Sequence, residues 1–128
     1  MIVLDENIPE GQRQLLARHR IRCSQIGVDL GQKGMQDDAI PALLMRLHRP
    51  TFFTRDQGFY RRELRHSRYC IVCLDTGREE VATFVQRLLK HPTFDTHGER
   101  LGAVLRLSSS GIRAWMPGAE REVSLVWE

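Results

Sequence analysis

The chain has 128 residues, of which 41% are hydrophobic and 27% are charged, with a formal net charge of +3 and a pI of about 9.1. These values are typical of one globular domain that is large enough to bury a hydrophobic core. They exclude a membrane-spanning class, because no apolar run approaches the roughly 20 residues that a transmembrane helix needs. The N-terminus also lacks the layout of a signal peptide, so we expect a single cytoplasmic domain, residues 1–128, without a membrane partner.

The three cysteines favour a reducing compartment, since an odd number does not make a disulfide framework. Cys70 and Cys73 form a C-x-x-C pattern inside the apolar run 69–74, which reads as a strand. Residues three apart on a strand point to opposite faces, so the two thiols should not converge. We expect buried, unreactive cysteines rather than half of a zinc site.

The first nine residues, Met-Ile-Val-Leu-Asp-Glu-Asn-Ile-Pro, predict a buried strand that ends in an acidic turn. Three apolar β-prone residues are interrupted by Asp5, Glu6 and Asn7, and Pro9 then favours the first turn of a helix. Ligands bind at the carboxyl ends of strands in an open parallel sheet. Acidic groups crowded there are costly unless a cation, a proton or solvent balances them.

Strand and helix patterns then alternate along the chain. We predict helices over residues 9–20, around 40–47 and over 78–90, and a short arginine-rich helix or turn over 59–66. We predict strands over residues 21–26, 51–54 and 69–74, a hairpin of 101–107 with 112–115, and a last strand within 122–127. Alternation of this kind predicts an α/β fold with a mainly parallel sheet, right-handed crossovers and an antiparallel C-terminal hairpin at one edge. The core would span residues 1–90 and the hairpin extension residues 99–128.

Carboxylates follow the predicted strands in a way that suggests a metal site. Asp5 follows the first strand, Asp56 follows the third, and Asp37 and Asp38 begin the helix after the second. In a parallel sheet these positions lie at one edge, so the side chains would face a single cleft. Mg²⁺ and Mn²⁺ prefer such oxygen ligands, and they promote phosphodiester cleavage by activating water and neutralising charge.

Three segments carry a resemblance to a known family: Leu4–Pro9, Gln36–Ile40 and Thr54–Phe59. In order and spacing they resemble the signature segments of small PIN-like domains, which are related to the VapC-type toxin ribonucleases. The resemblance runs from Met1 to about Lys90. It implies a three-layer α/β/α PIN-like fold and an endoribonuclease, a hydrolase that needs Mg²⁺ or Mn²⁺. It also implies a toxin–antitoxin setting, with an antitoxin protein encoded alongside and a homodimer as possible partners.

Carried over residue by residue, the resemblance assigns Asp5, Asp37 and Asp56 as the catalytic and metal-binding acids, with Asp38 beside Asp37. The chain departs from the family pattern at Gly58, where such domains commonly carry a fourth acid. That change should weaken a second metal site, although Asp75, at the end of the next strand, is a candidate to compensate.

Simpler roles are open for each of these residues. Asp5 is able to bond the backbone of its own turn, and Asp37, Asp38 or Asp56 to cap the helix that follows it. Pro41 disfavours a helical conformation at Ile40, which would move the helix start beyond Asp38.

Arginines near the third acid are candidates for binding the substrate. Arg55, Arg61 and Arg62 are placed to attract an RNA backbone toward the acidic edge, although a solvated surface explains them almost as well.

Two other functions compete with a nuclease. Loss of the acid at position 58 fits a PIN-like binding or regulatory module without catalysis. A phosphoacceptor receiver domain also places acids after its first and third strands, but it needs a lysine at the end of a late strand. The only two lysines, Lys33 and Lys90, are not in such a position.

Overall fold

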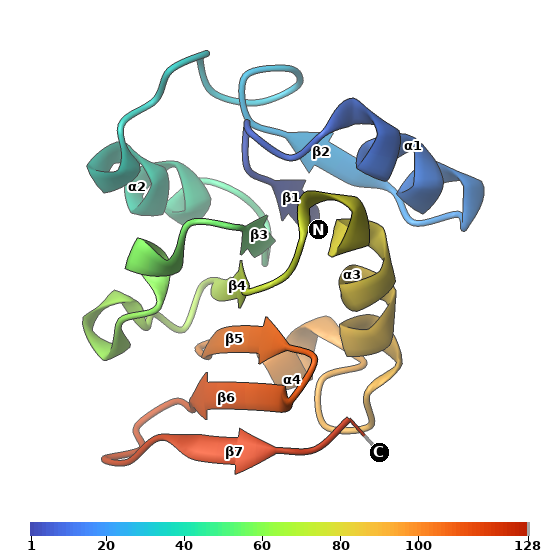
Figure 1. The fold of residues 1–128 in the computed structure, drawn as a ribbon. Coiled ribbons are helices and arrows are strands. Elements are labelled where there is room, and N and C mark those ends of the chain that lie inside the picture. The colour runs from blue at the N-terminus through green and yellow to red at the C-terminus, as the bar shows by residue number, and fades with distance from the viewer. Residues whose placement is uncertain (128) are drawn as a thin grey trace.

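The computed structural model describes residues 1–127, and its centre is one seven-stranded β-sheet (Figure 1). The strand order is β2-β1-β3-β4-β5-β6-β7, with parallel pairing from β2 through β5 and antiparallel pairing from β5 to β7. The strands are β1 (Ile2–Leu4), β2 (Cys23–Gln25), β3 (Thr51–Thr54), β4 (Cys70–Leu74), β5 (Val104–Ser108), β6 (Gly111–Trp115) and β7 (Val123–Leu125). This architecture confirms the predicted α/β class and the mostly parallel sheet.

Helices cover both faces of the sheet (Figure 1). They are α1 (Glu10–Arg18), α2 (Ile40–Met45), α3 (Val81–Lys90) and α4 (His97–Arg100), with 3₁₀ turns at Asp37–Ala39, Gln57–Phe59, Arg62–Leu64 and Arg78–Glu80. Helices α1 and α3 pack together on one face, and α2 packs on the other. Helix α2 begins at Ile40, with Pro41 in its first turn, and directly continues the 3₁₀ turn that starts at Asp37. The expectation that Pro41 keeps Ile40 out of the helical conformation is wrong, because Ile40 has φ −67° and ψ −46°.

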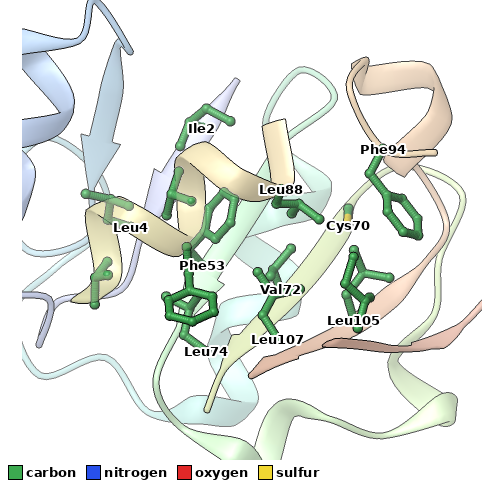
Figure 2. Packing of buried hydrophobic residues seen from close by; sticks show 14 of the residues in the cluster. Ile2, Leu4, Phe53, Cys70, Val72, Leu74, Leu88, Phe94, Leu105 and Leu107 are labelled. Atoms are coloured by element: carbon green, nitrogen blue, oxygen red, sulfur yellow. The ribbon is translucent and has the colours of Figure 1, made fainter. Parts of the chain in front are cut away.

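The alternation of the strand residues separates two hydrophobic clusters. Cys70, Val72 and Leu74 of β4 face the α1–α3 side, shown in Figure 2, whereas Ile71 and Cys73 face the α2 side. Side chains alternate along a strand because its period is two residues. The two thiols therefore point into different clusters, and Cys70 and Cys73 are buried and free, as predicted. Burial raises the pKa of each of these two thiols to about 12, which keeps them protonated and unreactive.

The C-terminal hairpin is built into the sheet. Strand β5 pairs in parallel with β4, and only β6 and β7 add antiparallel strands beyond it. Leu105 and Leu107 belong to the same cluster as the residues of α3 (Figure 2). Residues 104–125 thus supply one of the five parallel strands as well as the antiparallel edge that the sequence predicted.

One crossover differs in hand from the others. The β1–β2 and β4–β5 connections step in opposite directions along the sheet, yet α1 and α3 lie on the same face. Those two connections therefore have opposite hands. The β2–β3 connection steps in the opposite direction to β1–β2, but its helix α2 lies on the opposite face, so these two connections have the same hand. The prediction of right-handed crossovers throughout is wrong for β4–β5. The other face beside β3 and β4 is already covered by Phe59 and Leu64, so the apolar side of α3 packs next to α1.

Among residues 1–127, no helix combines the length and the apolar character that crossing a membrane requires.

Candidate metal-binding site at the sheet edge

The first and third predicted acids lie where the sheet changes direction. The first five strands have the order 2-1-3-4-5, in which the chain leaves β1 toward one edge and β3 toward the other. Such a switch point between β1 and β3 forms a crevice at the carboxyl ends of the strands, and ligands bind there. Asp5 directly follows β1, and Asp56 lies two residues after β3. The fold thus brings together two acids that are far apart in the sequence.

The Asp5 carboxylate is half-buried and held by two hydrogen bonds. Its Oδ1 accepts the Glu6 amide at 2.8 Å, and its Oδ2 accepts the Thr54 hydroxyl at 2.5 Å. The Asp5 amide also donates to the Phe53 carbonyl at 2.9 Å, which extends the β1–β3 pairing by one residue. Asp5 does bond its own turn, as the simpler interpretation expected, but the bond from Thr54 ties the same side chain to β3.

Thr54 links the two acids. Its hydroxyl donates to Asp5 and accepts the Asp56 amide at 3.0 Å. Asp56 in turn accepts the Gly58 amide on Oδ1 at 2.8 Å, so it caps the 3₁₀ turn that follows. The second oxygen of Asp56 has no role in that cap. The capping and the metal-binding interpretations of Asp56 are therefore compatible, because a carboxylate offers about four lone-pair sites.

The second predicted acid, Asp37, lies on the same cavity. This cavity has a volume of about 280 Å³ and is lined by Asp5, Glu6, Asn7, Ile8, Met35, Asp37, Arg55 and Asp56. Asp38 is not among these residues and instead lines a neighbouring depression. Neither Asp37 nor Asp38 caps a helix with its side chain, since Gln36 precedes the 3₁₀ turn and Ala39 precedes α2. The geometry therefore favours Asp37 over Asp38 as the second acid.

The charges in this cavity repel one another. A side-chain hydrogen bond with the neighbouring Asp56 is the main cause that raises the pKa of Asp37 above its ordinary value, and burial and the negative charges of Asp56, Asp5 and Asp38 add to the shift. Burial raises the pKa of Asp5, the charges of Asp56 and Glu6 add to this effect, and the bonds from Thr54 and the Glu6 amide oppose it. Carboxylates held together in this way favour the binding of a proton or a cation.

We expect Asp37→Asn to raise the melting temperature in metal-free buffer at pH 7. The pKa of Asp37 in the folded protein lies above its ordinary value of 3.8, so the folded state binds more protons than the unfolded state between these two pKa values. The free energy of unfolding therefore falls as the pH rises through the pKa that Asp37 has in the folded state. An uncharged asparagine does not lose stability in this way. The advantage of the variant should vanish below pH 3.8, where Asp37 is protonated in both states. Calorimetry from pH 3 to pH 8 measures this, and Asp38→Asn, which removes the same charge outside the cavity, is the matched control.

Two residues that the sequence did not single out shape the acidic loop. Buried Gln25, the last residue of β2, donates its side-chain amide to the carbonyls of Asp5, Glu6 and Ile8 at 2.9–3.3 Å. The other is Thr54, the bridge described above. The sequence held one weak signal for Gln25, a polar residue next to Ile26 in a predicted strand. Nothing in the sequence indicated which backbone it would meet.

The predicted substrate-binding arginines lie in three different environments. Arg55 lines the acidic cavity and donates to the Thr76 carbonyl at 3.0 and 3.2 Å. Arg61 lies beside Asp37 and Asp38 in the neighbouring depression and pairs weakly with Glu63 at 3.4 Å. The Arg62 guanidinium instead lies 5.6 Å from the ring centre of Trp115, where it packs against β6.

Asp75 does not lie on the acidic cavity. It is paired with Arg106 at 2.9 Å, at the end of β4. At the position of the missing fourth acid, a side chain would crowd Asp56, because a Cβ on Gly58 would lie 3.0 Å from Asp56 Oδ1. Neither position supplies a further carboxylate to the cavity.

No group of three or more histidine, cysteine or acidic side chains within residues 1–127 is already arranged to hold a metal ion. The donor chemistry nevertheless suits a hard cation, since Asp5, Asp37 and Asp56 provide carboxylate oxygens on one cavity. Mg²⁺ keeps several of its waters and is usually bound by only one or two carboxylates together with substrate phosphates. A complete cage of protein ligands is therefore not required.

Comparison of the chain with models of protein families, with curated proteins and with solved structures found no match.

Proposed function

We propose that this protein is a divalent-metal-dependent endoribonuclease of the PIN-like type, with Asp5, Asp37 and Asp56 as its metal ligands. The observation that carries the proposal is the placement of these three carboxylates on one cavity at the β1–β3 switch point. They come from three separate segments of the chain, each of which resembles a PIN-like signature. Their mutual repulsion favours a bound cation at neutral pH.

In this proposal the acidic residues of the cavity bind the metal and an arginine binds the substrate. Asp5 and Asp56 follow the adjacent strands β1 and β3, and they are linked through the Thr54 hydroxyl, which donates to the Asp5 carboxylate and accepts the backbone amide of Asp56. Asp37 approaches Asp56 from the 3₁₀ turn before α2. An Mg²⁺ or Mn²⁺ ion, when bound, would neutralise charge on the scissile phosphate and lower the pKa of the attacking water. Arg55 provides a positive charge on the same cavity, suited to orient a substrate phosphate.

The proposal extends to the setting of a toxin–antitoxin pair, with RNA as substrate, an antitoxin protein as inhibitor and a homodimer as the working form. It rests here on the resemblance of the three segments and on the net charge of +3. A small DNA-binding protein encoded by the neighbouring reading frame would support it.

RNA cleavage with and without metal tests the nuclease proposal. Purified protein should cleave single-stranded RNA in Mn²⁺ or Mg²⁺ and lose that activity in EDTA, and it should regain the activity when the metal is restored. Cleavage that survives exhaustive chelation would refute the metal-dependent mechanism.

A second candidate is a PIN-like binding or regulatory module that has lost catalysis. Two observations favour it: neither position 58, a glycine, nor Asp75 adds a carboxylate to the cavity, and the acids within residues 1–127 are not already arranged as a metal cluster. Titration calorimetry with Mn²⁺ separates the two functions. Heat of binding at millimolar metal or below, lost in Asp56→Asn, supports the nuclease, and its absence supports the inactive module.

The receiver-domain alternative shares the 2-1-3-4-5 strand order. This chain has no lysine at the end of β5, where a receiver domain needs one, because β5 ends in Arg106, Leu107 and Ser108. Lys33 lies in the loop before α2, and Lys90 is the last residue of α3, which covers the face of the sheet opposite to α2. Phosphorylation of Asp56 by acetyl phosphate would revive this alternative.

A further inference from the structure

A second polar cavity, which the proposed function does not use, lies over strands β5 to β7. Its volume is about 390 Å³, and the polar residues that line it are Asp75, Arg106, Ser108, Ser110, Arg113 and Ser124. The serines of the β5–β6 turn place it at the carboxyl end of β5, the sheet edge that also carries the acidic cavity.

Two arginines face each other across the strands in this second cavity. Arg106 of β5 and Arg113 of β6 are direct partners in the antiparallel register, and Ser124 of β7 is the next partner in the row. Their neighbours Leu105 and Ile112 point into the α1–α3 cluster, so both arginines lie on the α2 side of the sheet. Like charges directly opposite each other are destabilising unless an anion lies close by.

Each of these arginines has a carboxylate partner, but the two ion pairs are exposed and weak, so both guanidinium groups are able to bind another anion. Asp75 pairs with Arg106 at 2.9 Å, and Glu122 lies 3.7 Å from Arg113 while it also accepts the Tyr60 hydroxyl. The Arg113 side chain is 61% exposed and that of Arg106 38%. Ion pairs this exposed contribute little to stability, so a phosphate group is able to displace them. Guanidinium groups match phosphate oxygens with two parallel hydrogen bonds, and serine hydroxyls add further donors.

The two cavities are joined along the sheet edge. Arg55, on the acidic cavity, donates to the carbonyl of Thr76, and the preceding residue, Asp75, pairs with Arg106. Only β4 separates β3 from β5, so the strands that carry the two cavities are about 10 Å apart. A nucleic-acid strand that lies over the acidic cavity would pass close to Arg106 and Arg113.

We propose that Arg106, Arg113 and the serines beside them bind a backbone phosphate of single-stranded RNA, some nucleotides away from the phosphate at the acidic cavity. This inference rests on the proposed function for the substrate class. It gives the C-terminal hairpin a role in holding the substrate, and it predicts that the protein needs an RNA longer than the cleaved dinucleotide.

Binding of a fluorescein-labelled single-stranded RNA, measured by anisotropy in EDTA as a function of salt, tests the proposal without any cleavage. Arg113→Gln and Arg106→Gln should each weaken binding by about fivefold to tenfold and reduce the slope of log K against log salt by about 0.7, the loss of one phosphate contact. Arg18→Gln is the matched control, because it removes the same charge from exposed α1 on the opposite face.

Equal weakening by Arg18→Gln and Arg113→Gln would overturn the proposal, since it would show only an effect of net charge. Titration with inorganic phosphate identifies the alternative source of the anion. If Arg113→Gln weakens the binding of inorganic phosphate but not the binding of RNA, the cavity binds a free anion and the proposal is wrong. RNA binding that depends on Arg113 in a protein that never cleaves would refute the nuclease and leave this site standing.

Discussion

Asp5→Asn is expected to lower kcat/KM for metal-dependent RNA cleavage by at least about 10²-fold, because it removes a proposed ligand of the metal. The bound metal stabilises the transition state by several kcal/mol. The amide oxygen can still accept the Glu6 amide, and the amide NH₂ can donate to the Thr54 hydroxyl. The fold of the acidic turn should therefore persist, and the melting temperature at pH 7 should not fall, because the amide also removes the cost of a buried negative charge at this position. Cleavage rates at several Mn²⁺ concentrations, with circular dichroism of both proteins, measure the effect.

Asp38→Asn is the matched control for this prediction. It removes the same charge from a residue next to Asp37 but outside the acidic cavity, so activity should stay within about twofold of wild type. Undiminished cleavage by Asp5→Asn, or an equal loss in Asp38→Asn, would show that the reaction does not depend on the acidic cavity.

Gln25→Leu should destabilise the protein by about 1–3 kcal/mol and weaken Mn²⁺ binding by about tenfold to 100-fold. The side-chain amide of Gln25 donates to the carbonyls of Asp5, Glu6 and Ile8, and leucine leaves these carbonyls without that donor. The backbone that carries Asp5 then loses its support from β2. Urea denaturation measures the first effect, and calorimetry with Mn²⁺ measures the second.

Gln12→Leu provides the control for Gln25. Gln12 is also a buried glutamine, and its Oε1 accepts the Ala82 amide at 2.9 Å, which joins α1 to α3 away from the acids. It should lose stability to a similar extent and keep its affinity for Mn²⁺. A parallel loss of metal affinity in both variants would mean that Gln25 acts through global stability rather than through the acidic turn.

Much of the fold follows from patterns within single segments. The 51–54 run is β3 as predicted, and the apolar spacing of residues 81–88 forms the buried side of α3. The opposite orientation of Cys70 and Cys73 also followed from the strand period alone. The hand of the β4–β5 crossover did not, because it depends on which face of the sheet the segment 57–64 had already covered.

For the candidate site, local sequence was enough to predict which acids follow strands, namely Asp5 and Asp56, because a change from apolar to acidic residues marks a strand end. Tertiary packing set the rest: it placed Asp37 rather than Asp38 on the acidic cavity, connected Thr54 to both strand-end acids and directed the Gln25 amide toward the acidic turn. It also paired Asp75 with Arg106 rather than with the cavity. These choices depend on the distance between side chains of different segments, which is set when the strands pair and the helices pack.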